Sequence, residues 1–170
     1  PNTPVALGKG VLGAAVGNQL APAGRSLLNG LLERLGEVIW IDEDQMDALT
    51  SVSGSGPAFV YRWIEAFEAA AQQQGFSRQD AELMVRQTFV GALELLEDQG
   101  GDAAALRRAV TSKAGMTEAG LRVMDQSDPN GLMRSVLAAT AARGAELALG
   151  QDPMDLAQEA AELVAAAQPA

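Results

Sequence analysis

The 170-residue chain contains no cysteine and no histidine. Without cysteine it can form no disulfide and no thiolate, and a zinc site with sulfur ligands is excluded. The absence of histidine removes the commonest general base and the commonest metal ligand. Any chemistry must therefore use hydroxyls, carboxylates, backbone amides or a cofactor, and we expect no metal site.

Positive charge is also scarce. The chain has 12 Lys and Arg residues and 22 Asp and Glu residues, which gives a formal net charge of −10. This balance argues against a nucleic-acid partner, because phosphate binding needs clustered basic side chains. No apolar run approaches the roughly 20 residues of a membrane span. The start, Pro1-Asn2-Thr3-Pro4, has neither the basic segment nor the apolar region of a secretory signal. We therefore expect a soluble protein located in the cytoplasm.

Aromatic residues make up only 4% of the chain, although 48% of it is hydrophobic. The core must be built from Ala, Leu, Val and Met, and this composition favours closely packed helices. No segment after Asp44 has the pattern of a strand. Wide apolar arcs are expected on three helices, Phe59 to Gln73, Gln79 to Asp98 and Leu132 to Leu149. A last helix is expected over Met154 to Ala167. A single copy would leave much of these arcs exposed, so we expect a homodimer with interlocked helices or a higher oligomer.

The first 42 residues differ from the rest. Val5 to Val16 is rich in Gly and Val and is interpreted as strand and turn, Pro22 to Leu35 as a helix, and Glu37 to Ile41 as a buried strand. This order predicts a β-α-β unit, which cannot form a stable sheet alone. The predicted fold class is therefore mostly α: a helical bundle dimerisation domain, residues 43–170, preceded by a short β-α-β remnant of a Rossmann-like α/β domain, residues 1–42.

Two segments break the helical pattern, and such breaks often mark functional sites. The first is Ser53-Gly54-Ser55-Gly56-Pro57, either a tight turn or a loop that lets a ligand approach the backbone. The second runs from Thr111 to Thr117, where three hydroxyls, a lysine and a glycine precede a helix. Unpaired N–H groups and the helix dipole make such a start suitable for a carboxylate. The simpler interpretation is capping alone, with Thr117 as N-cap.

The run VTSKAGMTEAGL, Val110 to Leu121, closely resembles a sequence block of pyrroline-5-carboxylate reductases. The Ser53 to Pro57 run and the opening Pro-Asn-Thr-Pro resemble other blocks of that family in the same order, and the resemblance covers about residues 1–149. There are departures. The family usually has Pro where Lys113 stands, Gly where Ala114 stands, and Thr or Ala where Met116 stands. We expect Ala114 to be tolerated only with a negative φ.

The resemblance implies an enzyme that reduces 1-pyrroline-5-carboxylate to L-proline with hydride from NADPH or NADH, in proline biosynthesis. Family members have an amino-terminal Rossmann domain and a helical carboxy-terminal domain. The glycine cluster from Gly8 to Gly17 is interpreted as having neither the spacing nor the context of a dinucleotide-binding fingerprint. The cofactor half is therefore expected to be missing, as in a proteolysed or trimmed chain, and the isolated chain to be inactive.

The resemblance also implies roles for single residues. Ser112, Gly115, Met116 and Thr117 are expected to bind the substrate carboxylate. Thr117 is expected to be catalytic, as the hydrogen-bond partner of the imine nitrogen. Asn2 and Thr3 are expected to face the nicotinamide of the cofactor.

Two alternatives remain at this point. A β-hydroxyacid dehydrogenase shares the general plan but uses a helical lysine for acid–base chemistry, whereas the two lysines here, Lys9 and Lys113, lie in non-helical segments. A non-catalytic helical dimerisation module is the alternative from another functional class.

Overall fold

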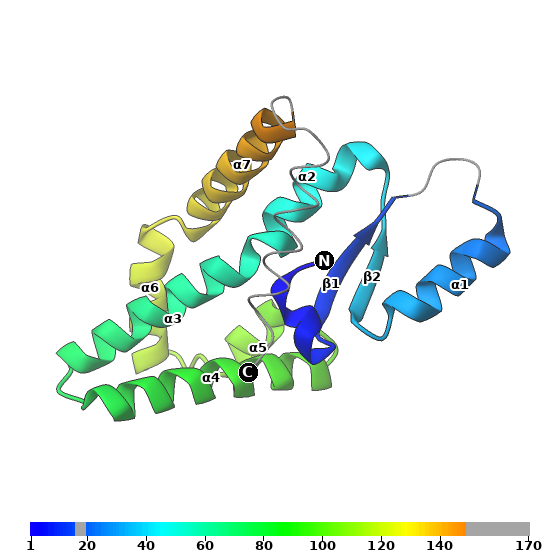
Figure 1. Cartoon of the computed structure of the whole chain (residues 1–170). Coiled ribbons are helices and arrows are strands. Elements are labelled where there is room, and N and C mark those ends of the chain that lie inside the picture. Colours follow the sequence, from blue (N-terminus) through cyan, green and yellow to red (C-terminus); the bar gives the residue numbers. More distant parts are fainter. Residues whose placement is uncertain (16–19, 149–170) are drawn as a thin grey trace. The chain divides into compact units, whose positions relative to one another are not determined.

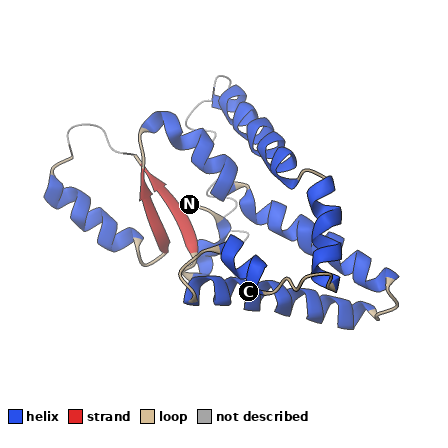
Figure 2. Cartoon of the chain, turned by 180° about the vertical axis from the view of Figure 1, so that it is seen from behind, coloured by secondary structure: helices blue, strands red, loops and turns tan. Residues whose placement is uncertain are grey.

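The computed structural model describes residues 1–15 and 20–148. The chain is mostly helical with one two-stranded parallel sheet (Figure 2), so the predicted fold class is confirmed. The helix expected over Met154 to Ala167 lies outside the described residues. Two compact units can be distinguished: one contains Pro1–Ser55 with the chain from Ser135 onward, and the other contains Gly56–Arg134. The boundary after residue 42 stays a prediction.

The first unit begins with the expected β-α-β arrangement. A 3₁₀ helix, η1 (Thr3–Leu7), precedes strand β1 (Gly10–Ala14), helix α1 (Pro22–Leu32) and strand β2 (Gly36–Trp40). The strands pair in parallel from Gly10 opposite Gly36 to Ala14 opposite Trp40. The stretch from Val5 was expected to start as strand and turn, but it starts as a helical turn. Pro4 favours a first helical turn, and Gly8 ends it at φ +66°.

Glycine is required where the two strands begin. Gly36 has φ +141°, and a Cβ atom there would overlap the backbone of Gly10. Leu12, in the middle of β1, is only 4% exposed. Two side-chain contacts join α1 to β2. The Arg25 guanidinium lies 4.4 Å from the centre of the Trp40 ring, and the Trp40 indole N–H donates to Asn29 Oδ1 at 2.9 Å. The sheet is thus anchored by close backbone approach at one end and by α1 at the other.

The segment after β2 is helical almost throughout. A 3₁₀ turn, η2 (Glu43–Gln45), leads into α2 (Met46–Leu49) and then into one π-helical turn, η3 (Thr50–Gly54). The N–H of Ser55 bonds to the carbonyl of Thr50 at 2.9 Å, the wide spacing of a π turn. The prediction of a tight turn or loop at Ser53–Pro57 is therefore wrong, because Ser53 and Gly54 complete a helical turn and Gly56 already begins the next helix.

The second unit consists of helices α3 (Gly56–Gln73), α4 (Arg78–Asp98), α5 (Ala103–Ala109) and α6 (Met116–Gln126), with the beginning of α7 (Pro129–Ala148). Helices α3 and α4 form an antiparallel hairpin (Figure 1). Local side chains determine where α4 and α5 begin. Ser77 accepts from the Asp80 N–H at 3.1 Å, and Asp102 accepts from the Ala105 N–H at 2.9 Å. Both are side-chain caps at a helix start.

Few apolar side chains of the described residues are buried in one copy. Leu12, Ala81 and Val85 are the buried hydrophobic residues. Large apolar residues on α3 and α4 lie open, among them Leu83 at 62% and Leu93 at 57%. Exposed apolar residues in such numbers on two neighbouring helices are candidates for an interaction surface. Within the described part of the chain, no helix combines the length and the apolar character needed to cross a bilayer.

Candidate functional site

The first chain segment and the π turn meet inside the first unit. Asn2 joins them, because its Nδ2 donates to the Ser53 carbonyl at 2.9 Å and its Oδ1 accepts from the Val11 N–H at 2.9 Å. The side-chain N–H and the side-chain oxygen of Asn2 are thus both hydrogen-bonded to the backbone of other segments. A cavity of about 410 Å³ is found here, within the range of roughly 300–1,000 Å³ that is typical of small-ligand sites. Its lining residues are Pro1, Gly13, Met46, Leu49, Thr50, Ser53 and Gly54.

This cavity brings together two sequence motifs that are separated by some fifty residues in the chain. The opening Pro-Asn-Thr-Pro contributes Pro1, and the Ser-Gly-Ser-Gly-Pro run contributes Ser53 and Gly54. Thr3 begins η1 and is exposed. The cofactor-facing roles of Asn2 and Thr3 stay predictions.

The glycine cluster before the cavity needs one correction. Gly8, Gly10 and Gly13 do have the G-x-G-x-x-G spacing, so the interpretation of their spacing was wrong. Their context differs from that of a dinucleotide fingerprint, which joins a strand to a helix. Here Gly10 and Gly13 lie within β1, and a Cβ atom on Gly13 would come within 2.9 Å of Leu49. These glycines allow close packing inside the unit.

The second candidate site is the start of α6, in the second unit. Gly115 is the N-cap with extended backbone, φ −86° and ψ 172°, and Met116 is the first helical residue. The prediction that Thr117 caps the helix is therefore wrong. Thr117 lies inside the first turn, exposed, where the backbone N–H groups of a helix have no partner within the helix.

The four residues expected to bind substrate come together at this helix start. The Gly115 N–H donates to the Ser112 carbonyl at 3.0 Å, so that donor is already used within the loop. A Cβ atom on Gly115 would overlap Ser112 Oγ, which places the Ser112 hydroxyl against the N-cap residue. Met116 is 94% exposed. The available donors are therefore the hydroxyls of Ser112 and Thr117 and the first-turn amides of Met116 and Thr117.

Ala114 precedes the N-cap with φ +59°. The condition under which Ala114 was expected to be tolerated, a negative φ, is therefore not met. The left-handed conformation costs a residue with a Cβ atom roughly 1–2 kcal/mol. The Ala114 N–H donates to Glu118 Oε2 at 2.7 Å, a bond from the loop to the first turn of α6. Glu118 was not among the predicted site residues, although a glutamate three residues after an N-cap is a known capping signal.

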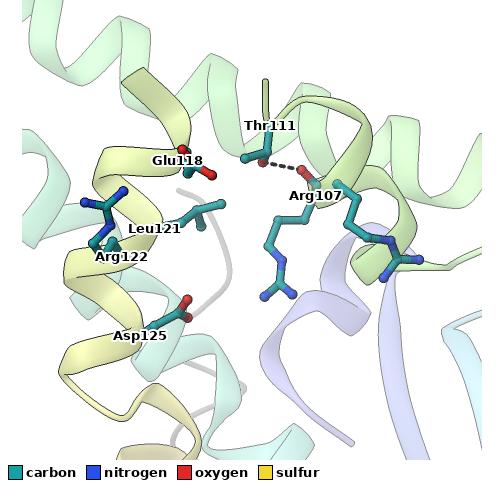
Figure 3. A pocket seen from close by; sticks show the side chains of 7 residues that line it. Arg107, Thr111, Glu118, Leu121, Arg122 and Asp125 are labelled. Atoms are coloured by element: carbon teal, nitrogen blue, oxygen red, sulfur yellow. Dashed lines mark hydrogen bonds between the residues drawn. The ribbon is translucent and has the colours of Figure 1, made fainter. Parts of the chain in front are cut away.

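Beside the loop lies a cavity of about 310 Å³ within the second unit (Figure 3). It is lined by Arg107, Arg108, Thr111, Glu118, Leu121, Arg122 and Asp125. The Thr111 hydroxyl donates to the Arg107 carbonyl at 2.6 Å and so closes the end of α5. These three arginines lie on two different helices, α5 and α6, so their grouping around one cavity could not be predicted from the sequence.

Comparisons with known proteins agree with one another. The model of the pyrroline-5-carboxylate reductase dimerisation family matches residues 43–147. Pyrroline-5-carboxylate reductase 2 of Bacillus subtilis is 37% identical over 147 residues, which cover 86% of this chain and 53% of the relative. A pyrroline-5-carboxylate reductase of Staphylococcus haemolyticus is 31% identical, with 89% of this chain and 56% of the relative covered.

Solved structures give the same result. The structure of a pyrroline-5-carboxylate reductase from Coxiella burnetii matches with a TM-score of 0.83 and 32% identity, covering 86% of this chain and 55% of that one. Plasmodium falciparum pyrroline carboxylate reductase, solved with NADP bound, matches with a TM-score of 0.76 and 26% identity, covering 84% and 59%. The chain spans about half the length of the curated relatives it matches.

Proposed function

Because the chain belongs to the pyrroline-5-carboxylate reductase family, we propose that it forms the helical, substrate-binding part of an NAD(P)H-dependent reductase. The proposed reaction converts 1-pyrroline-5-carboxylate to L-proline. The observation that carries this proposal is the start of α6, where the Ser112 hydroxyl lies against the N-cap residue Gly115 and Thr117 lies in the first turn. A cytoplasmic location stays a prediction of the composition.

The proposed site binds the substrate by its carboxylate. Amide N–H groups at a helix start and hydroxyl groups are good donors to a carboxylate, and the helix dipole adds to the attraction. Met116 contributes its backbone N–H, since its side chain points into solvent. Gly115 contributes shape, because only a residue without Cβ leaves room for the Ser112 hydroxyl.

Thr117 is proposed to act on the imine. The nicotinamide supplies the hydride, and the ring nitrogen must hold a proton while its double bond is reduced. A hydroxyl next to the carboxylate-binding amides can accept a hydrogen bond from this protonated nitrogen. This role needs no group that titrates near neutral pH, which fits a chain without histidine or cysteine.

The cofactor is proposed to be NADPH or NADH. The relative from Plasmodium falciparum was solved with NADP, which supports a nicotinamide cofactor for the family. Of the residues described, only the first unit offers candidates, Asn2 and Thr3, close to the cavity lined by Pro1 and Ser53. The two-stranded sheet and its glycines do not form a phosphate loop. We therefore propose that this chain alone neither binds the dinucleotide tightly nor turns over.

A homodimer is proposed for the helical part. The matched family model describes a dimerisation domain, and it begins at residue 43, next to the proposed boundary between the two domains. The open apolar residues of α4 supply a suitable surface. A non-catalytic dimerisation module is the second candidate function, favoured by the partial coverage of the relatives. None of the relatives described above is a β-hydroxyacid dehydrogenase.

The test of this function is Thr117→Ala in the complete protein. Loss of a hydrogen bond made in the transition state should raise the barrier by about 2–4 kcal/mol, which lowers the rate roughly 30- to 1000-fold. Thr117→Ser keeps a hydroxyl and should retain most of the activity. Since Gly115, and not Thr117, is the N-cap, the melting temperature should change little. The catalytic role is refuted if the catalytic constants of Thr117→Ala stay within about twofold of the original protein.

The activity of the complete protein separates the two candidate functions, and calorimetry on the 170-residue chain tests the proposed lack of tight cofactor binding. We expect no tight NAD(P)H binding by this chain and imine reduction by the complete protein. If the complete protein also fails to reduce the imine acid, the dimerisation module becomes the better description.

A further inference from the structure

The carboxylate of Glu118 bonds to the loop and not to its own helix. Glu118 is the third residue of α6 and is half-buried. Its Oε2 accepts from the Ala114 N–H at 2.7 Å. Ala114 is the residue held at φ +59°, directly before the N-cap of the helix. A hydrogen bond thus joins the first turn of α6 to Ala114, whose left-handed backbone conformation is unfavourable for a residue with a Cβ atom.

A competing partner for Glu118 is available one turn further along. Arg122 stands four residues after Glu118, and a glutamate followed at this spacing by a basic residue is the favourable order on a helix. Both residues line the cavity beside the loop. Yet the ion pairs among the described residues do not include Glu118 with Arg122. In Figure 3 the two side chains leave α6 in different directions. The loop amide therefore prevails over the ion pair.

The conformation of Ala114 sets the direction of the amides that follow it. The next N–H, that of Gly115, points back to the Ser112 carbonyl at 3.0 Å. This bond closes the turn that brings Ser112 Oγ against Gly115. If Ala114 relaxed to a negative φ, the peptide plane between Ala114 and Gly115 would rotate and the turn would open. Ser112 would then leave the helix start.

We propose that Glu118 is a positioning residue for the substrate-carboxylate site, which holds Ala114 in the left-handed conformation and thereby keeps Ser112 beside the first-turn amides of α6. The proposal rests on the proposed function. The Glu118 carboxylate is bound at Ala114, and so it leaves the amides of Met116 and Thr117 to the substrate. Glu118 itself touches neither substrate nor cofactor in this arrangement.

The test compares three variants of the complete protein: Glu118→Ala, Glu118→Gln and the double variant Glu118→Ala with Ala114→Gly. Glu118→Ala should raise KM for the imine acid about tenfold, the scale of one lost hydrogen bond, and change kcat much less. Glu118→Gln keeps an oxygen acceptor and should stay close to the original KM. The double variant should recover most of the KM, because glycine adopts the left-handed conformation without cost. Because the glycine also removes the strain at residue 114 and so raises stability by itself, KM and not the melting temperature is the measure of rescue.

A second measurement does not depend on activity. Hydrogen exchange of the Ala114 amide, followed by NMR, should become about tenfold faster in Glu118→Ala than in the original protein, while amides in the middle of α4 keep their rates. If the protein fails to reduce the imine acid but this exchange effect is seen, the proposed function fails and the positioning contact stands.

Three results would overturn the proposal. The first is an unchanged KM in Glu118→Ala. The second is a lower KM, which would make Glu118 a competitor of the substrate carboxylate. The third is equal KM values for Glu118→Ala and the double variant, since the role of Glu118 would then not pass through Ala114.

Discussion

The two units of this chain differ in how closely their backbone segments approach one another. In the unit that contains the sheet, small residues allow backbone to meet backbone, as where Gly36 contacts Gly10, and Leu12 is 4% exposed. In the helical unit, Leu83 and Leu93 on α4 remain 62% and 57% exposed. Leu27 on α1, in the unit that contains the sheet, is also 67% exposed. The two units therefore differ in the close backbone contact at Gly36, and the open residues of α4 are the surface proposed above for the homodimer.

The two candidate sites differ in the same way. At the π turn, the Ser53 carbonyl accepts from Asn2, and Ser53 Oγ donates to the Leu49 carbonyl at 3.0 Å. The polar groups of this motif mainly hold the unit together. At the start of α6, by contrast, Thr117 stays exposed at a helix end whose amides have no helical partner. A motif that satisfies its own groups is a scaffold, and one that leaves donors open can bind a ligand.

The largest effect on stability is expected in the sheet. Gly36→Ala should destabilise the chain by about 3 kcal/mol or more, because the new Cβ would overlap Gly10 and alanine disfavours the φ of +141°. Gly30→Ala is the matched control in the same unit. Nothing lies within 4 Å of a Cβ there, so the helix α1 should gain roughly 0.5–1 kcal/mol. Urea denaturation of both variants measures the two changes, and equal midpoints would contradict the role given to close backbone approach.

An intermediate effect is expected on the open face of α4. Leu83→Glu should weaken the proposed dimer about 100-fold, since each of two copies would lose roughly 1.5 kcal/mol of apolar burial. The helix content of the single chain should stay the same, because Leu83 is already exposed in one copy. Sedimentation at several concentrations measures the association, and circular dichroism checks the helices. Leu83→Met keeps the apolar surface and should leave the dimer intact. A stable monomer of the original chain at micromolar concentration would contradict the comparison between the units.

The smallest effect is expected at a helix cap in the second unit. Ser77→Ala should cost about 1 kcal/mol, because the Asp80 N–H loses its acceptor at the start of α4. Gln79→Ala, two residues on and exposed, is the control and should change the stability by less than about 0.5 kcal/mol. Thermal unfolding compares them. Equal melting temperatures would show that α4 is held by its packing alone.

Much of this architecture could be predicted from residues that act on their neighbours. Ser77 and Asp102 cap the helices that follow them, and Gly75 ends α3 at φ +98°. The β-α-β order predicted the parallel pair of β1 and β2. These signals succeed because a cap or a left-handed glycine determines structure within one turn of itself. The order of the three motifs likewise predicted the family, which the comparisons confirm.

Other features depended on tertiary contacts. The sequence suggested a turn at Ser53–Pro57, but the structure continues the helix through a π turn. There the side chain of Asn2, some fifty residues earlier in the chain, donates a hydrogen bond to the Ser53 carbonyl. Ala114 was expected to be tolerated only with a negative φ, but its φ is positive, and a carboxylate from the next helix accepts a hydrogen bond from its N–H. Local preferences are worth about 1–2 kcal/mol per residue, and a single well-placed hydrogen bond can outweigh them. The sequence by itself therefore determined most of the helices, the caps at Ser77 and Asp102, and the family. Only the tertiary structure decided how the loop before α6 presents Ser112 and Thr117.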